Sequence, residues 1–412
     1  MSTIAPLDGV RVLDLSRVLA GPYCTMLLAD LGADVIKVER PGIGDETRSW
    51  GPPHVGGEAA YYLSTNRNKR SVAIDLSDPR GRELVLRLAA RSDIVIENFR
   101  EDGADKLGIG YDALTEVRPG IVLCSISGFG PGREPAGRPG YDFIAQAECG
   151  LMSITGEVDG PASKVGVALV DVITGLHAAV GILAAHARQV RTGEGEHIQI
   201  SLLDAGIAAL VNVTANALAT GKEARRYGNA HPNVVPYQTF AAADGELALA
   251  APNDHMFRRL CEILELPELA DDPRFVNNAD RVTNRDELIP ILGAEIARRP
   301  VQDWMEQLSA RGVPAGKVRG VLEALEAAAA AGRPATVTVP HPTAGVVELV
   351  ASPIRLAHTE GNAPLAPPLL GQHTREILAE IGLSDDDTLA IEQAGVVSSS
   401  EAQGELIYGS GE

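Results

Sequence analysis

The stretch VRVLDLSRVLAGPYCTMLLADLGADVIKVE (10–39) decides the fold class of this chain. Residues 10–16 form an apolar run that predicts a buried strand, and residues 33–39 repeat that pattern. Between the two runs, an Ala-Gly-Pro turn leads into apolar residues that predict a helix up to residue 31. A strand, a helix and a second strand in this order are typical of a parallel sheet covered by helices.

Three further apolar runs extend this alternation, at residues 71–76, 93–99 and 121–130, and residues 79–91 predict an amphipathic helix between two of them. We therefore predict an α/β fold with a parallel sheet. A dinucleotide-binding enzyme would carry G-x-G-x-x-G after its first strand, and SRVLAGP stands there instead. Glu39 imitates the ribose-binding acid of such enzymes, but an acid at a strand end does not identify a nicotinamide site without the glycines.

Composition and charge narrow the classes of partner. The chain has 412 residues and a formal net charge of −19, whereas nucleic-acid-binding proteins normally carry a basic face. We expect no nucleic-acid partner, although a local basic patch could still bind a small anion. The four cysteines form no CxxC pair, so we expect free buried thiols and a reducing, cytoplasmic location. The nine histidines show no metal-ligand spacing, and we expect no metal site.

Targeting and membrane signals are weak in this sequence. The first residues, MSTIAPLDG, lack the basic and apolar regions of a signal peptide. No run approaches the roughly 18 apolar residues of a membrane span. The most apolar segment, GLHAAVGILAAHA (175–187), contains His177 and His186, and we interpret it as a core helix with His177 as a satisfied core residue. We therefore expect no membrane association.

A change of composition marks a second domain. Residues 222–236, KEARRYGNAHPNVVP, are basic and rich in turn formers, unlike the apolar helices before them. We predict that residues 1–224 form the first part of a large domain and residues 225–330 a smaller domain. Residues 331–412 then return to the large domain and end in a polar tail.

Asp171 is the one charged residue in VGVALVDVITG (165–175). A carboxylate among apolar neighbours is costly unless something satisfies it. Because a long helix is predicted to follow, the simplest interpretation is a helix N-cap. The alternative is a carboxylate nucleophile, kept ionised by the positive end of the helix. The two interpretations are compatible.

Other candidate ligand contacts lie at predicted strand ends. The cluster NRNKR (66–70) and Arg40 could form a cationic rim for a phosphorylated cofactor, or a solvated surface turn. Asn98 and Phe99 end a predicted strand, where an amide and a ring could hold a ligand. The loop at residues 128–142 leaves the carboxyl end of a strand, the edge where open α/β sheets bind ligands, although it could be a plain connector.

These signals form one pattern along the chain. The segments that carry it are DLSRVLAGPYCTMLLADLGADVIKVERPGIGDETR (14–48), NRNKRSVAIDL (66–76), IENF (96–99), SISGFGPG (125–132), GYDFIAQAECGLMSITGE (140–157), VGVALVDVITGLHAA (165–179) and RTGEGEHIQISLLDA (191–205). Together they resemble the class III CoA-transferase family, which includes formyl-CoA transferases, carnitine CoA-transferases and α-methylacyl-CoA racemases. The resemblance runs from about residue 7 to PPLLGQHT (367–374) and AGVV (394–397).

The resemblance implies an architecture and a reaction. The large domain is expected to be Rossmann-like and built from both chain ends, with a small α+β domain inserted and two chains interlocked as a homodimer. The family's nucleophile falls on Asp171, which attacks a CoA thioester, passes through a mixed anhydride and carries CoA as an aspartyl thioester. CoA thioesters and free carboxylic acids are then the substrates, and no cofactor is tightly bound. The implied CoA contacts are Val18, Ala20, Arg40, Asn98, Phe99, Lys106 and Leu107.

One position separates transferases from racemases in this family. Racemases carry histidine in a G-H-D motif, whereas this chain has Gly140-Tyr141-Asp142. Tyrosine, with an unperturbed pKa of about 10, is a poor acid or base at neutral pH. We therefore expect a transferase in which Tyr141 bonds the acyl or pantetheine group. The alternatives are a racemase-type isomerase and a non-catalytic CoA-binding paralogue.

The acceptor is expected to be glutarate or a related dicarboxylate and the donor succinyl-CoA. RSWGPPHVG (48–56), YYLSTNRNKRS (61–71) and RRYGNAHPNVVPYQTF (225–240) are most similar to family members that exchange CoA between these acids. Leu19 stands where some oxalate-using members have glutamine, so oxalate or another acid is the alternative. A distal carboxylate needs a cationic partner, and the candidates are Arg17, Arg48, Arg226 and His231.

Overall fold

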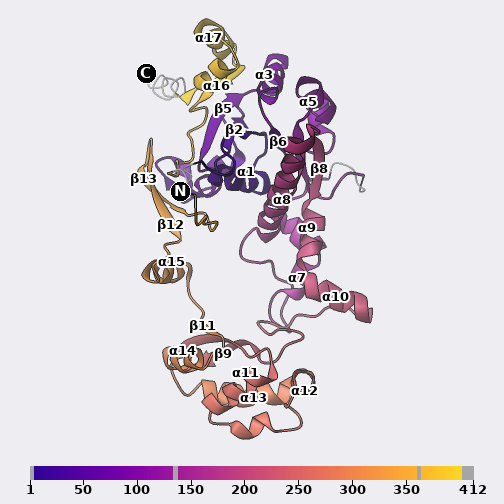
Figure 1. Ribbon diagram of the computed structural model, residues 1–412, viewed down its shortest axis with the longest axis vertical. Helices are drawn as coiled ribbons and strands as arrows, with labels where there is room; N and C mark the ends of the chain where they lie inside the picture. Colours follow the sequence, from indigo (N-terminus) through magenta and orange to yellow (C-terminus); the bar gives the residue numbers. More distant parts are fainter. Residues whose placement is uncertain (1–3, 133–137, 360–362, 401–412) are drawn as a thin grey trace. The chain divides into compact units, whose positions relative to one another are not determined.

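The computed structural model of the chain describes residues 4–132, 138–359 and 363–400 (Figure 1). The chain forms two compact units. The first comprises Met1–Leu151, Val165–Thr214 and Arg333–Glu412, and the second comprises Met152–Lys164 and Ala215–Gly332. The sequence placed the divisions after residues 224 and 330. The structure places them after Thr214 and Gly332, and it adds Met152–Lys164 to the second unit, which the sequence did not indicate.

A seven-stranded sheet forms the centre of the first unit, in the order β14-β5-β2-β1-β6-β7-β8. All neighbouring strands are parallel except β14 and β5. The strands are β1 (Arg11–Asp14), β2 (Asp34–Glu39), β5 (Lys69–Ile74), β6 (Ile94–Glu97), β7 (Val122–Ser127), β8 (Glu196–Ser201) and β14 (Val397–Ser398). The five strands predicted before residue 130 are therefore confirmed, and so is a mixed α/β fold with a mainly parallel sheet.

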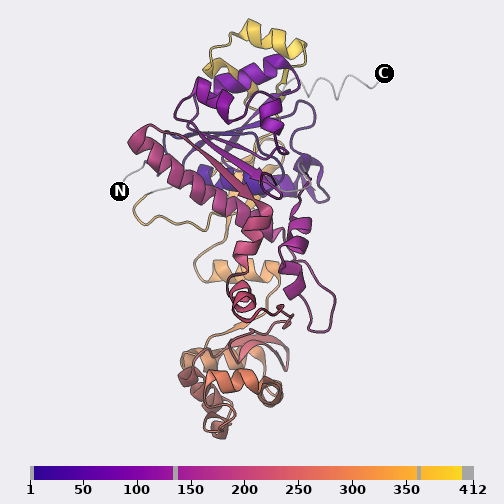
Figure 2. The same ribbon diagram turned by 90° about the vertical axis from the view of Figure 1, so that its right-hand side faces the viewer.

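Helices cover both faces of this sheet, as Figure 2 shows. Successive side chains of a strand point to opposite faces. Val12 and Val35 accordingly pack with the helices at residues 20–30 and 169–192, while Leu13 and Ile36 pack with the helices at residues 79–89, 111–117 and 374–380. The described helices of this unit include α1 (Ala20–Asp30), α2 (Ala60–Leu63), α3 (Pro79–Ala89), α4 (Gly103–Lys106), α5 (Tyr111–Val117), α6 (Asp142–Glu148), α8 (Leu169–Thr192), α9 (Leu202–Ala209), α16 (Thr374–Glu380) and α17 (Asp385–Gln393), with the 3₁₀ turn η1 (Glu46–Ser49).

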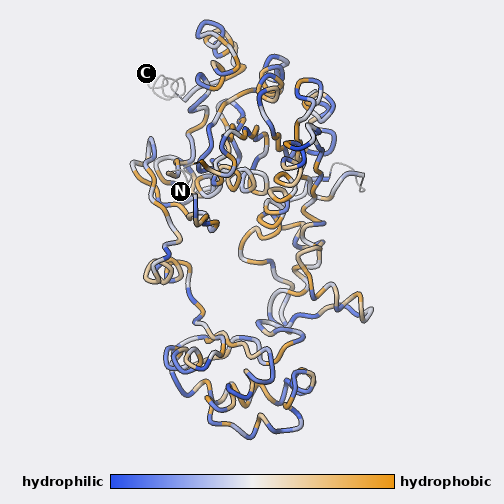
Figure 3. Tube along the Cα trace, in the orientation of Figure 1, coloured by the Kyte–Doolittle hydropathy of each residue, from blue (hydrophilic) through white to orange (hydrophobic). Residues whose placement is uncertain are grey.

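Helix α8 packs directly against α1. A Cβ atom at Gly175 would lie 2.6 Å from the carbonyl oxygen of Ala20, so only glycine allows this approach. Val170, Ala178 and Ile182 on the same side of α8 are fully buried, and Figure 3 shows the apolar character of the helix. His177, in contrast, is exposed and its ring contacts the carbonyl of Ile173, so the prediction of a core histidine is wrong.

By length and composition, α8 is apolar enough to cross a membrane, and so is the bent pair of α9 and α10 (Val211–Thr220). This overturns the expectation that no segment reaches that length. One or two such helices are weak evidence for a span, because a core helix of a soluble protein can be equally long and apolar.

The second unit has its own core. Strands β9 (Tyr237–Ala242), β10 (Gly245–Ala250) and β11 (Ala315–Lys317) form an antiparallel sheet. Fully buried Phe257, Phe275 and Trp304 pack among its helices. Those helices are α11 (Asp254–Ile263), α12 (Asn278–Thr283), α13 (Arg285–Ile296) and α14 (Val301–Ala310), and α15 (Val321–Ala330) buries no residue. In the first unit, β12 (Thr336–His341) and β13 (Gly345–Val350) form a hairpin packed on Tyr62.

Candidate active site

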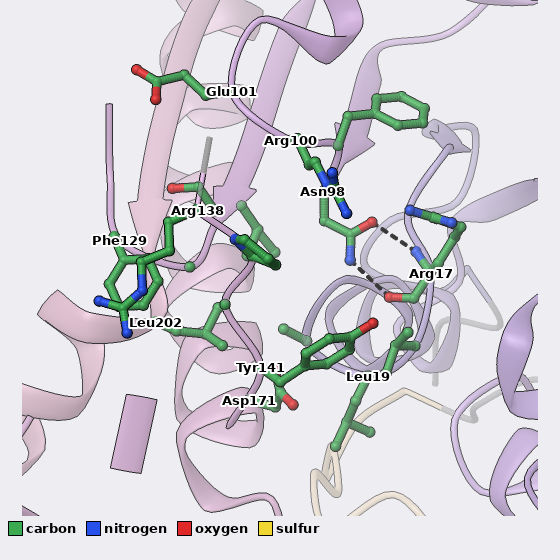
Figure 4. A pocket seen from close by; sticks show the side chains of 18 of the residues that line it. Arg17, Leu19, Asn98, Arg100, Glu101, Phe129, Arg138, Tyr141, Asp171 and Leu202 are labelled. Carbon is green, nitrogen blue, oxygen red and sulfur yellow. Dashed lines mark hydrogen bonds between the residues drawn. The ribbon is translucent and has the colours of Figure 1, made fainter. Parts of the chain in front are cut away.

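A cavity lies at the carboxyl ends of strands β1, β6 and β7, the edge where open α/β sheets bind ligands. It holds about 1170 Å³ of space free of atoms, open solvent included. Residues 17–20, 98–101, 126–130 and 138–141 line it together with Asp171, Leu202 and Glu46, all from the first unit. Figure 4 shows side chains from separate loops, such as Asn98 and Tyr141, together with Asp171 and Leu202 from helices α8 and α9.

Asp171 lies in the first turn of α8, but it does not cap the helix. Ala168 is the N-cap residue and makes no side-chain capping bond. The Asp171 side chain instead lines the cavity. The N-cap interpretation is therefore wrong, and the carboxyl group is available for another role.

The residue that satisfies the start of α8 is Asp142, which sequence reasoning missed. One oxygen of its buried carboxylate accepts hydrogen bonds from the backbone amides of Val170 (2.8 Å) and Asp171 (3.3 Å). The other oxygen accepts from Gln146 Nε2 at 2.6 Å. Tyr141, the preceding residue, lines the cavity. The Gly-Tyr-Asp motif thus places one side chain in the cavity and the next on the helix end, and the motif was the available signal.

The surroundings of Asp171 change its acidity. Burial first, and then the negative charge of Asp142, raise the pKa of Asp171 to about 7. The sequence argument expected the helix end to keep this carboxyl ionised. Burial and a neighbouring carboxylate act in the opposite direction, so protonated and ionised forms coexist near neutral pH.

Asn98 joins two walls of the cavity. Its Oδ1 accepts from the Arg17 amide at 2.9 Å and its Nδ2 donates to the Arg17 carbonyl at 2.8 Å (Figure 4). The next amide, that of Phe99, donates to the buried carboxylate of Glu97 at 2.7 Å. A ligand amide at Asn98 would compete with two existing hydrogen bonds. The main contact of the Asn98 side chain is therefore structural: it joins the loop after β6 to the loop after β1.

The predicted ligand contacts divide between this cavity and a neighbouring one. Residues 17–20, Asn98, Phe99 and Tyr141 line the cavity that contains Asp171. Arg40 lines a second cavity, of about 1240 Å³ including open solvent, whose wall shares Arg17, Glu46 and Phe99 with the first. Two cavities with common walls suit one long ligand.

The structure does not bring Lys106 and Leu107 to either cavity. Among the described residues, neither lines these two cavities. The Lys106 side chain is exposed, with its Nζ 3.9 Å from Asp102. Leu107 packs against the core on the α3 side of the sheet. The position of a residue in a sequence motif does not show the direction of its side chain, here toward solvent for Lys106 and toward the core for Leu107.

Arg48, predicted as a candidate partner for the distal carboxylate of the acceptor, is paired within the fold. Its buried guanidinium pairs with Glu39 at 2.7 Å and with Glu58 at 2.9 Å. It also lies over the ring of Tyr62, 3.7 Å from the centroid. With two carboxylates already bound, Arg48 stabilises the fold and has no free face for an acceptor acid.

The cationic rim predicted at residues 66–70 is neutralised in the structure. Arg67 pairs with Asp30, and Arg70 pairs with Asp34 and Glu380. Lys69 is fully buried, with its Nζ 3.1 Å from Asp14. These cations thus form ion pairs with acidic residues distant in sequence. This corrects the expectation that residues 66–70 form a phosphate-binding rim.

Arg226 and His231 belong to the second unit. Arg226 donates to the backbone carbonyls of Ser153, Glu157 and Gly160 at 2.7–3.1 Å and so fixes that segment. The His231 ring lies 5.3 Å from that of Tyr237 and accepts a bond from the amide of Asn233. In the part of the chain that the structure describes, neither lines the cavity with Asp171. Of the four predicted acceptor cations, Arg17 is the one that does.

No candidate metal centre accompanies this site: residues 4–132, 138–359 and 363–400 hold no group of three or more His, Cys, Asp or Glu side chains placed to bind a metal ion.

The chain matches known proteins over most of its length. The family model described as CoA-transferase family III matches residues 7–374. The chain is 43% identical over 404 residues to the succinyl-CoA:glutarate CoA-transferase of Mus musculus, covering 97% of this chain and 92% of that protein. It is 44% identical over 382 residues to the succinate–glutarate CoA-transferase of Agrobacterium fabrum, covering 91% and 96%. The crystal structure of a CAIB/BAIF family protein from Brucella suis matches with a TM-score of 0.80 and 41% identity, covering 92% and 100%.

Proposed function

The chain belongs to CoA-transferase family III and is an enzyme of the CoA-transferase type, and from this premise we propose that it transfers CoA from succinyl-CoA to glutarate. The observation that carries the proposal is Asp171, a carboxyl group without a capping role in a cavity at the ligand-binding edge of the sheet. Two relatives named for succinate and glutarate, each more than 40% identical over most of the chain, support this choice of acids.

We propose Asp171 as the nucleophile. Its carboxylate attacks the thioester carbonyl of succinyl-CoA, the C–S bond breaks, and CoA thiolate leaves a mixed anhydride. The thiolate then attacks the aspartyl carbonyl, which releases succinate and leaves an aspartyl-CoA thioester. Glutarate displaces the thiolate again to form a second anhydride. Attack of the thiolate on the glutaryl carbonyl yields glutaryl-CoA and restores the Asp171 carboxylate.

The cavity walls support the charge changes in these steps. Leu19 and Ala20 line the cavity at the start of α1, a helix end without a side-chain cap. Its first backbone amides can therefore stabilise the oxyanion that forms at each attacked carbonyl. The apolar side chains of Leu19 and Leu202 limit water, which would hydrolyse an anhydride. The Tyr141 hydroxyl is a further donor to the acyl or pantetheine group.

We propose that CoA spans the two cavities. Its phosphates lie in the cavity lined by Arg40, and its pantetheine passes the shared wall of Arg17 and Phe99 toward Asp171. Arg17 is the proposed partner for the distal carboxylate of the acids. Its guanidinium pairs with Glu46 at 2.7 Å, but both side chains are nearly half exposed. An exposed pair of this kind is worth only about 0–1 kcal/mol, so a substrate carboxylate can compete for Arg17.

The first test is an acid panel. Succinyl-CoA is mixed with the protein and, separately, glutarate, adipate, malonate, oxalate or butyrate, and the new thioesters are measured by mass spectrometry. Glutaryl-CoA is expected to form fastest, because two relatives more than 40% identical over most of the chain are named for glutarate. Faster transfer to another acid would reject glutarate as acceptor, and absence of any transfer would reject the transferase assignment.

A second prediction concerns Asp142. Asp142→Asn removes the like charge beside Asp171 but keeps an oxygen that can accept from the α8 amides. The acid limb of kcat/KM, set near pH 7 by the ionisation of Asp171, should therefore move to lower pH. The measurement is a pH–rate profile from about pH 5 to pH 9. Asp387→Asn, at an exposed cap of α17, is the matched control. A limb that stays in place for Asp142→Asn would contradict the assignment of Asp171 as the ionising group.

We also propose that two chains form an interlocked homodimer in a reducing, cytoplasmic compartment. Large apolar side chains stay exposed on helices α8 and α10, among them Val180, Val190, Val211 and Leu218, the last at 81%. Large apolar side chains left exposed along helices support a protein interface. Four cysteines are buried and unpaired, which supports the compartment. Sedimentation at the mass of one chain would contradict the dimer.

A further inference from the structure

Three consecutive residues, Ser16 and the cavity-lining Arg17 and Val18, have backbone groups that are hydrogen-bonded by side chains. The Ser16 amide donates to Asp14 at 3.0 Å, and Lys37 Nζ donates to the Ser16 carbonyl at 2.9 Å. Asn98 holds both backbone groups of Arg17, as described above. The Val18 amide donates to the carboxylate of Asp45, at 3.2 Å to its nearer oxygen. This density of side-chain contacts fixes the backbone just before Leu19 and Ala20.

Val18 stands in a conformation that valine avoids. Its φ angle is +70°, in the left-handed region, where a β-branched side chain is strained. Such strain persists only where the surroundings impose it, and it gathers at functional sites. Among the described residues, the side chain that accepts a hydrogen bond from the Val18 amide is that of Asp45, so Asp45 is the natural source of the constraint.

Asp45 is built to act as a fixed anchor. It is 2% exposed, and its carboxylate lies 2.9 Å from Lys37 Nζ. The amide and hydroxyl of Thr47 donate to the same carboxylate at 3.0 Å and 2.8 Å. Burial opposes ionisation, but Lys37 and Thr47 outweigh it and lower the pKa of Asp45 to about 2. The anchor therefore keeps its charge across the working pH range.

We propose that Asp45 is a positioning residue for CoA transfer, which holds Val18 in the left-handed conformation and so sets where Leu19 and Ala20 face the Asp171 cavity. This inference rests on the proposed function for its link to catalysis. Asp45 also caps η1, and a purely structural cap would not depend on the conformation of Val18. That difference gives the test.

The test compares glycine with alanine at position 18. Glycine adopts positive φ freely and alanine does not, although both remove the valine side chain. Asp45→Asn is expected to lower kcat/KM for succinyl-CoA by about 10-fold to 100-fold, the effect of a displaced cavity wall. Adding Val18→Gly should restore most of the loss, whereas adding Val18→Ala should not. Asp78→Asn, which alters a similar but exposed cap of α3, should leave kcat/KM unchanged.

Two further measurements keep the outcome decisive. If Asp45→Asn fails to fold, Thr47→Val loosens the same anchor without unpairing Lys37, and its loss should likewise be rescued by glycine and not by alanine. The single variant Val18→Gly should melt at a higher temperature than Val18→Ala, a readout that needs no turnover and so survives failure of the glutarate proposal. Equal melting of the two variants, or equal rescue by glycine and alanine, would overturn the role of Asp45.

Discussion

Asp171→Ala is expected to lower the rate of CoA transfer by about 10⁴-fold or more, because loss of the proposed nucleophile removes the covalent pathway itself. Asp171 lines the cavity and forms no helix cap, so the substitution leaves the capping bonds from Asp142 in place. The measurement is intact-mass spectrometry after mixing with succinyl-CoA and glutarate. Wild type should yield glutaryl-CoA and a trapped CoA adduct on Asp171, and the alanine variant should yield neither.

The controls separate lost chemistry from lost folding. Burial of the Asp171 charge beside Asp142 opposes ionisation in the folded state, so the alanine variant should melt no lower than wild type at pH 8. Asp271→Ala, at an exposed aspartate of the second unit, should transfer CoA at the wild-type rate. Glutaryl-CoA from the Asp171→Ala variant would show that another group attacks the thioester. An adduct on wild type without glutaryl-CoA would keep the nucleophile and reject the acceptor.

Lys37→Met is expected to lower the free energy of unfolding by about 3–5 kcal/mol, the usual cost of leaving one member of a buried ion pair alone. Lys37 and Asp45 have no exposed side-chain surface, and the Lys37 ammonium also bonds the Ser16 carbonyl. Burial opposes the ammonium charge, but Asp45, Asp14 and Glu39 outweigh it and raise the pKa of Lys37. A raised lysine pKa stabilises the folded state below the unfolded pKa, so the contribution is complete at neutral pH.

Lys317→Met is the matched comparison. The Lys317–Glu323 pair is closer, at 2.7 Å, but both side chains are almost half exposed, so its loss should cost less than about 1 kcal/mol. Urea unfolding followed by the fluorescence of Trp50 and Trp304, one in each unit, measures both variants. In the Lys37 variant, the unfolding transition followed by Trp50 should move to a lower urea concentration. Equal losses for Lys37→Met and Lys317→Met would show that burial of the pair contributes nothing.

The two predictions concern one site. In the proposed mechanism Asp171 is the nucleophile, and the buried charges of Lys37 and Asp45 lie at the backbone of residues 16–18, beside the same cavity. If the proposal is right, a loop fixed by buried ions keeps its amides directed at the reacting carbonyl when the substrate binds. The stability of the unit and the geometry of its cavity therefore depend on the same residues.

Local pattern in the sequence was enough for the parallel sheet. Strands at residues 10–16, 33–39 and 93–99 follow from apolar runs separated by helical periods, and the structure confirms them as β1, β2 and β6. The same pattern exposed Asp171, because a charge stands out among apolar neighbours. Strand ends indicated Asn98, Phe99 and the loop at residues 128–142 as ligand contacts, and the family resemblance added Val18 and Ala20. Asn98, Phe99, Tyr141, Val18 and Ala20 do line one cavity.

Only the tertiary structure determined which polar groups form ion pairs and hydrogen bonds with one another. Arg48 finds its carboxylates at Glu39 and Glu58, Arg17 is clamped by Asn98 from 81 residues away, and α8 is capped by Asp142 from 28 residues away. The periodicity of the sequence predicts which side chains are buried, because burial depends on the face of the helix or strand that a side chain occupies. Hydrogen bonds and ion pairs depend on distances of about 3 Å between groups remote in the chain, and only the packed fold sets those distances.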